Sequence, residues 1–131
     1  MHNRSKLVEQ LLAKGVCIPA PESVEIDENL SPDRISADGV TIHAGCKIYG
    51  AATYISRNVS IGREGPVTID NCQVGPRVRL GGGFYADAVF LEDVKTGANA
   101  HVREGTIMEE ASSLAHAVGL KQTILFPFVT L

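Results

Sequence analysis

At 131 residues the chain is one domain or part of one, long enough for a hydrophobic core but too short for a two-domain enzyme. Its 12 basic residues are spread among 15 acidic ones, which excludes the basic surface of a nucleic-acid binder, so we expect no nucleic-acid partner. The sequence has no apolar run of membrane-spanning length and no basic, apolar and small leader, so we expect a cytoplasmic protein with no membrane partner.

Residues 1–34 are predicted to form one short α-helix followed by an extended connector. Apolar residues recur at helical spacing between Ser5, which can cap the helix, and Gly15, which can end it. The helix has one apolar stripe, which we expect to cover the first coil of the domain that follows. Three prolines between residues 17 and 34 favour extended backbone in the connector.

A repeat of six residues runs through residues 35–131. From Phe90 onward, large apolar residues recur at every sixth position with a single exception, Thr96, in the series Phe90, Thr96, Val102, Met108, Leu114, Leu120 and Phe126. Four residues after each stands a small or β-branched residue, in the series Val94, Ala100, Thr106, Ser112, Val118, Ile124 and Thr130. With occasional steps of seven and one of four, the same template fits Ile35, Ile42, Ile48, Ile55, Ile61, Val67, Val74, Leu80 and Ala86.

One large and one small inward residue in every six is typical of a parallel β-helix, so the sequence predicts an all-β fold of hexapeptide repeats. Three repeats make one coil, and residues 18 apart should therefore lie above one another on adjacent coils about 4.8 Å apart. Residues 35–131 would form about five coils. An amphipathic helix over residues 108–118 is the alternative, because good helix formers gather there, but the repeat continues through them unbroken.

The three cysteines, Cys17, Cys46 and Cys72, are odd in number and lack the close paired spacing of zinc or redox motifs. We expect reduced, mostly buried thiols and no metal site. The three consecutive glycines Gly81, Gly82 and Gly83 are interpreted as a turn within a repeat, not as a phosphate-binding loop.

The string AHVREG at residues 100–105 and the longer string AHAVGLKQTILFPFVTL at residues 115–131 resemble the left-handed β-helix hexapeptide-repeat transferases. Within that family the likeness is to the β-helix part of bacterial proteins of the N-acetylglucosamine-1-phosphate uridyltransferase (UDP-N-acetylglucosamine pyrophosphorylase) type. The resemblance implies a left-handed helix, a homotrimer, and sites in clefts between subunits. The uridyltransferase loop has no counterpart here, and the ladder continues to Leu131, where further coils or a cap would be expected.

Two cations, Arg103 and Lys121, are 18 residues apart and each follows an inward position, so they should stack on adjacent coils. Like charges opposite one another on a sheet repel, and a phosphate or diphosphate would relieve the repulsion. Glu104 and Gln122 should lie beside them. The sequence therefore predicts a ligand-binding site for a sugar phosphate or sugar nucleotide, although two long side chains whose charged ends diverge into solvent would fit the pattern equally.

The candidate catalytic bases are His101 and His116. The resemblance implies acyl transfer from acetyl-CoA as co-substrate, with no covalently bound cofactor, and imidazole can accept the acceptor's proton at neutral pH. A histidine with only a structural hydrogen bond is the alternative for each. Two roles thus remain open: a transferase of amino-sugar acetyl or nucleotidyl groups, or a non-catalytic trimerising scaffold of a larger nucleotidyltransferase.

Overall fold

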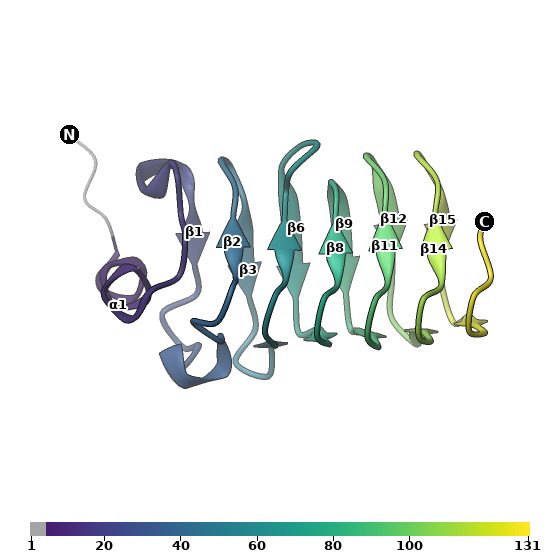
Figure 1. The fold of residues 1–131 in the computed structure, drawn as a ribbon, viewed down its shortest axis with the longest axis horizontal. Coiled ribbons are helices and arrows are strands. Elements are labelled where there is room, and N and C mark those ends of the chain that lie inside the picture. The colour runs from purple at the N-terminus through teal and green to yellow at the C-terminus, as the bar shows by residue number, and fades with distance from the viewer. Residues whose placement is uncertain (1–4) are drawn as a thin grey trace.

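The computed structural model describes residues 5–131 and shows a parallel β-solenoid with one α-helix at its N-terminal end. Residues 1–4 of the predicted N-terminal segment lie outside the described part. Three parallel sheets form the sides of the solenoid, and their strands stack along its long axis (Figure 1). The prediction of an all-β parallel helix of short repeats is therefore confirmed, and the strands that occupy residues 108–118 exclude the alternative helix there.

The strands are short and contribute one rung each to a sheet. Sheet A contains β2 (Thr41–Ile42), β5 (Ser60–Ile61), β8 (Arg79–Leu80), β11 (Lys95–Thr96) and β14 (Ser113–Leu114). Sheet B contains β1 (Glu25–Ile26), β3 (Lys47–Tyr49), β6 (Val67–Asp70), β9 (Gly83–Ala86), β12 (Ala100–Val102) and β15 (Gly119–Leu120). Sheet C contains β4 (Tyr54–Ile55), β7 (Gln73–Val74), β10 (Ala88–Phe90), β13 (Thr106–Met108) and β16 (Ile124–Leu125).

The helix α1 (Lys6–Lys14) covers the N-terminal end of the stack, as its sequence predicts (Figure 1). The Ser5 hydroxyl accepts a hydrogen bond from the Val8 N–H, and Gly15 ends the helix in the left-handed conformation at φ 112°. The buried residues of its apolar stripe are Leu7, Val8 and Leu11. Burying this stripe removes apolar surface from water at both the helix and the first coil.

The segment predicted as a connector already takes part in the ladder. Two short 3-10 helices, η1 (Pro21–Ser23) and η2 (Pro32–Arg34), flank β1, and β1 pairs with β3 in sheet B. The β-ladder therefore begins before Ile35, in an irregular first coil. None of the helices in residues 5–131 has the length and apolar character needed to cross a membrane.

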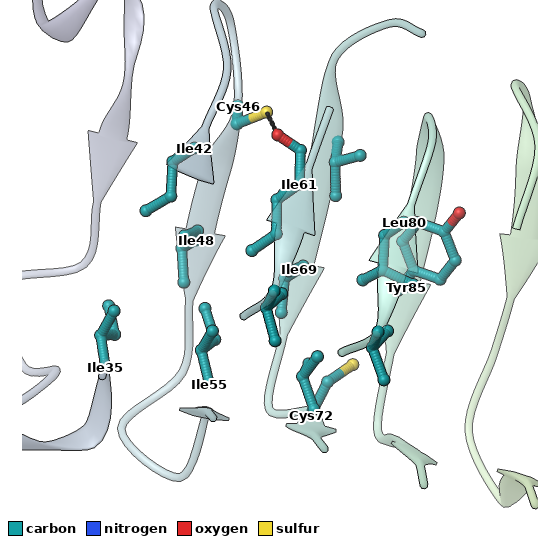
Figure 2. Packing of buried hydrophobic residues seen from close by; sticks show 14 of the residues in the cluster. Ile35, Ile42, Cys46, Ile48, Ile55, Ile61, Ile69, Cys72, Leu80 and Tyr85 are labelled. Atoms are coloured by element: carbon teal, nitrogen blue, oxygen red, sulfur yellow. Dashed lines mark hydrogen bonds between the residues drawn. The ribbon is translucent and has the colours of Figure 1, made fainter. Parts of the chain in front are cut away.

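The core is a column of aliphatic side chains inside the solenoid. Figure 2 shows Ile42, Ile48, Ile55, Ile61 and Ile69 projecting into the interior from the three sides. Cys46 and Cys72 are buried in the same column, while Cys17 is exposed. Burial raises the pKa of the Cys72 thiol to about 11, so this thiol stays protonated at neutral pH and behaves as a small apolar group.

The predicted register is right in the middle of the chain and wrong in three places. The 18-residue spacing holds from Phe90 to Leu120: Phe90 pairs with Met108, and Val102 pairs with Leu120. Ala86 was expected inside, but Tyr85 is the buried residue there, at 0% exposure. Ile69 likewise takes the large inward position of its side, while Val67 fills the small one opposite Gly83.

The last rung is also shifted by one residue. Phe126 and Ile124 were expected to point inward, yet they are 64% and 55% exposed, and Leu125 is the buried residue. Leu125 pairs with Met108, because the corner after Leu120 is one residue shorter than the corresponding corner after Val102. Phe128 is 77% exposed as well.

Candidate functional site

The predicted cationic pair lies at the corner between sheets B and C. Val102 and Leu120 are register partners on β12 and β15, and the N–H of Arg103 donates to the carbonyl of Leu120 at 2.8 Å. Arg103 and Lys121 therefore leave adjacent coils at the same corner, as the 18-residue spacing predicts. Both side chains are exposed to solvent. We call Arg103, Lys121 and the neighbouring Glu104 the corner site.

A carboxylate within the corner site offsets part of the expected repulsion. Nζ of Lys121 lies 3.4 Å from Oε1 of Glu104. The pKa of Glu104 is lowered, first by its own backbone N–H, then by the hydrogen bond from Lys121 and the charge of Arg103. Gln122 contacts the corner site through its backbone, because its N–H donates a hydrogen bond to the Glu104 carbonyl at 3.0 Å. The corner site thus carries one net positive charge.

His101 lies on the outer face of β12, two residues before Arg103. Its ring packs against Phe84 on the preceding coil, with 5.8 Å between centroids and 31° between planes. Gly119 is its register partner on the following coil and has no side chain to cover it. Among residues 5–131 nothing hydrogen-bonds to the imidazole nitrogens of His101, so both are available to a ligand.

The structure does not bring His116 to the corner site. His116 follows β14 at the corner between sheets A and B, where its Nδ1 accepts a hydrogen bond from the Ala98 N–H at 2.9 Å. Nδ1 is thereby the unprotonated nitrogen and Nε2 carries the proton in the neutral ring. Oε1 of Glu64 is 4.0 Å from Nδ1, too far for a hydrogen bond. The geometry gives His116 a structural contact and occupies the nitrogen that a base would use.

A second cationic cluster, which the repeat did not predict, lies on the outer face of sheet A. Arg79 of β8 and Lys95 of β11 are direct register partners, and Ser60 of β5 is the partner of Arg79 on the other side. Arg63 and Glu64, from the loop after β5, complete a groove of about 310 Å³ with these side chains. We call this the sheet A groove; its floor is formed by buried Leu80, Gly81 and Thr96.

The sheet A groove escaped the sequence analysis because its two cations are 16 residues apart, not 18. Two corners in the intervening coil are shortened, so that Tyr85 and Phe90, five residues apart, are the buried residues of adjacent sides. A search that allowed five-residue steps between large apolar residues would have aligned Arg79 with Lys95. The signal was therefore present in the positions of Leu80, Tyr85 and Phe90.

Stacked parallel rungs with one large and one small inward residue per side define a parallel β-helix protein of the hexapeptide-repeat class. The chain is similar to the bifunctional protein GlmU of Pelobacter propionicus, at 30% identity over 93% of the chain. It is 32% identical over 93% of its length to GlmU of Geotalea uraniireducens and to GlmU of Thermotoga petrophila. These relatives confirm the resemblance seen in the sequence, and the chain is a GlmU-like hexapeptide-repeat domain.

The match covers only part of the relatives. The chain spans about a quarter of their length, 25% of the first two and 26% of the third. No protein-family model and no solved structure matches the chain.

Proposed function

We propose that this chain is the β-helix part of an amino-sugar acetyltransferase-type enzyme, which binds a sugar phosphate or sugar nucleotide at the corner site. The observation that carries this proposal is the register of Val102 with Leu120, since it puts Arg103 and Lys121 side by side on an exposed corner. The similarity to GlmU proteins supports the transferase class.

Anion binding follows from the charges at the corner site. Two exposed cations and one carboxylate leave a net positive charge, and a guanidinium can donate two parallel hydrogen bonds to a phosphate. A phosphate dianion would compete with Glu104 for Lys121 and would meet Arg103 without displacing another partner, because Arg103 forms no ion pair among residues 5–131. The corner site therefore suits a phosphate monoester or a diphosphate.

His101 is the better placed of the two candidate bases. Its nitrogens are free within the described chain, and the Phe84 ring holds one side of the imidazole. In acyl transfer from acetyl-CoA, the acceptor amine would attack the thioester carbonyl while His101 takes the amine proton. The new C–N bond would replace the C–S bond, and the leaving thiolate would receive the proton. The general-base role requires an open nitrogen, which His116 lacks.

A homotrimer is the proposed assembly, and sheet C supplies its candidate contact surface. Val89, Ile107 and Ile124 are register partners on the outer face of β10, β13 and β16. Ile107 and Ile124 are 37% and 55% exposed, and Leu91 beside them is 43% exposed. An outward ladder of aliphatic residues is unusual on a solvated face and favours contact with another subunit.

That same surface favours the alternative function, a trimerising scaffold whose chemistry lies in other parts of a larger nucleotidyltransferase. Calorimetric titration with UDP-N-acetylglucosamine and with acetyl-CoA, on protein whose oligomeric mass has been measured, separates the two. We expect saturable binding of the sugar nucleotide that weakens at least about tenfold when Arg103 and Lys121 are both replaced by Gln. A folded trimer that binds neither ligand would reject the transferase and support the scaffold.

A matched control uses the other cationic cluster. The Arg79→Gln, Lys95→Gln variant removes the same net charge on a different face and should keep the sugar-nucleotide site whose affinity depends on Arg103 and Lys121. If both double variants lose affinity equally, binding reflects net charge alone and the corner site is rejected.

A further inference from the structure

The sheet A groove holds two cations that face each other on adjacent strands without an ion pair among residues 5–131. Arg79 and Lys95 are register partners in outward positions of adjacent parallel strands. Like charges directly opposite on one sheet face are destabilising. Among residues 5–131, no carboxylate lies within ion-pair distance of either side chain. The fold thus tolerates a repulsion on its surface that a bound anion would remove.

Two cations elsewhere in the fold do have carboxylate partners. Arg77 stands two residues before Arg79 and binds Asp93 at 2.9 Å and Glu92 at 2.7 Å. At the corner site, Lys121 is paired with Glu104. Other exposed cations, such as Arg57 and Arg103, also lack an ion pair among residues 5–131, so what distinguishes Arg79 and Lys95 is that they are direct register partners above a hollow in the surface.

Additional donors converge on the groove. Ser60 is the register partner of Arg79, and within the described residues its hydroxyl makes no hydrogen bond. Arg63, exposed on the loop after β5, lines the same hollow and is also without an ion-pair partner in residues 5–131. Three cationic groups and one hydroxyl therefore line a concave surface of about 310 Å³, at the lower end of the size of small-molecule sites.

Among residues 5–131, Glu64 is the one acidic residue that lines the groove, and its carboxylate lies over the groove floor. Its carboxylate lies over Gly81, where a methyl group in place of the glycine hydrogen would collide with it. Its other oxygen is 4.0 Å from Nδ1 of His116. The groove consequently keeps a net charge of two positive units from Arg63, Arg79 and Lys95 against Glu64.

We propose that the sheet A groove is a second anion site, which binds the phosphate groups of a small organic phosphate or diphosphate through Arg63, Arg79, Lys95 and Ser60. Guanidinium and ammonium groups bind phosphate oxygens through charge-assisted hydrogen bonds, and the buried groove floor limits access of water from one side. The site is separate from the corner site, on another sheet and on earlier coils, and does not depend on the proposed transferase function.

The test is calorimetric titration of the full chain with inorganic diphosphate and, in parallel, inorganic phosphate at constant ionic strength. We expect saturable binding of diphosphate, tighter than that of phosphate because it can bridge the two stacked cations. Replacement of Arg79 and Lys95 by Gln should weaken diphosphate binding at least about tenfold. Unchanged binding in this variant would overturn the proposal.

Two further variants complete the test. The Arg103→Gln, Lys121→Gln variant loses equal charge at the corner site and should keep at least one diphosphate site of wild-type affinity; an equal loss in both double variants would mean diffuse electrostatic attraction and would also overturn the proposal. Ser60→Asp should abolish binding at the groove while the thermal midpoint of the unliganded protein stays level or rises, because the new carboxylate would neutralise Arg79. Diphosphate binding that survives Ser60→Asp would place the ligand elsewhere.

Discussion

The two cationic pairs of this solenoid differ in how their charge is compensated. At the corner site, Lys121 is paired with Glu104, whose pKa is lowered by its own backbone N–H and by the charges of Lys121 and Arg103. In the sheet A groove, Arg79 and Lys95 face each other without a carboxylate in ion-pair distance among residues 5–131. The stacking of two cations therefore does not by itself define how strongly they destabilise the fold. At the corner site a neighbouring carboxylate offsets part of the repulsion, whereas Arg79 and Lys95 have no such ion pair among residues 5–131.

The two cations of the corner site differ in the core beneath them, and this gives the largest expected effect. Val102, beside Arg103, is 0% exposed, whereas Leu120, beside Lys121, is only half-buried. Val102→Asp would place an unpaired charge inside the solenoid and should cost roughly 4 kcal/mol or more of unfolding free energy. Leu120→Asp can turn toward water and should cost about 1–2 kcal/mol. Urea unfolding followed by circular dichroism measures both, and equal losses would show that the last coil is packed as tightly as the middle.

The floor of the sheet A groove rests on a buried hydroxyl. The Tyr85 hydroxyl donates to the Gly82 carbonyl at 2.6 Å and lies 2.5 Å from Oγ1 of Thr96, and burial raises its pKa so that it stays protonated. Tyr85→Phe should leave the Gly82 carbonyl without this donor and the Thr96 hydroxyl without this acceptor, and should lower the unfolding free energy by about 1–2 kcal/mol. It should also weaken diphosphate binding at the groove but not sugar-nucleotide binding at the corner site. A loss at both sites would mean that the variant disturbs the whole stack.

Removing a single charge should stabilise the protein at one pair and not at the other. Arg79→Gln relieves repulsion from Lys95 and should raise the unfolding free energy by about 0.2–0.5 kcal/mol. Arg103→Gln removes an attraction to Glu104 as well as a repulsion from Lys121, so no gain is expected. Thermal melting at low salt measures the difference, which should shrink at 0.5 M salt because screening weakens both effects. A stabilising effect of Arg103→Gln as large as that of Arg79→Gln would show that Glu104 does not compensate the corner site.

The smallest effect concerns pH. The lowered pKa of Glu104 means that its carboxylate favours the folded state above the ordinary Glu pKa of about 4.3, and that this contribution is lost as pH falls through the lowered value. Protonation of Glu104 also frees Lys121 for an external anion. Sulfate binding at the corner site should therefore strengthen as pH falls through the lowered pKa of Glu104, and Glu104→Gln should remove that pH dependence. If sulfate binding has the same pH dependence in the wild type and in the variant, Glu104 does not control anion binding at the corner site.

Much of the fold could be predicted from the sequence because inward residues in a solenoid repeat directly along the chain. The spacing of Phe90, Val102 and Met108 located their strands, and the stacking of Arg103 on Lys121 followed from it. The errors at Ala86 and Phe126 have the same form: the steps from Leu80 to Tyr85 and from Leu120 to Leu125 contain five residues where the repeat has six. A repeat search built on steps of six places the next inward residue one position too late after such a corner.

The candidate site was less predictable than the fold. Outward residues carry no periodic hydrophobic signal, so the pairing of Arg79 with Lys95 depended on the corners between them. The pairing of Lys121 with Glu104 depended on side-chain directions that spacing does not define. His116 shows the same limit, since nothing in the repeat indicates that its Nδ1 accepts a bond from Ala98.

The shortened corners have a consequence for how such a surface changes during evolution. Deleting one residue at a corner can leave every inward side chain in place, and the outward residues that alternate with them then keep their neighbours on the adjacent coils. Two five-residue steps lie between Leu80 and Thr96, yet Arg79 and Lys95, which precede them, remain register partners. Single-codon deletions at corners can therefore be absorbed without rearranging the ladders of outward side chains, so a binding surface on a sheet face can persist while corner lengths drift among homologues.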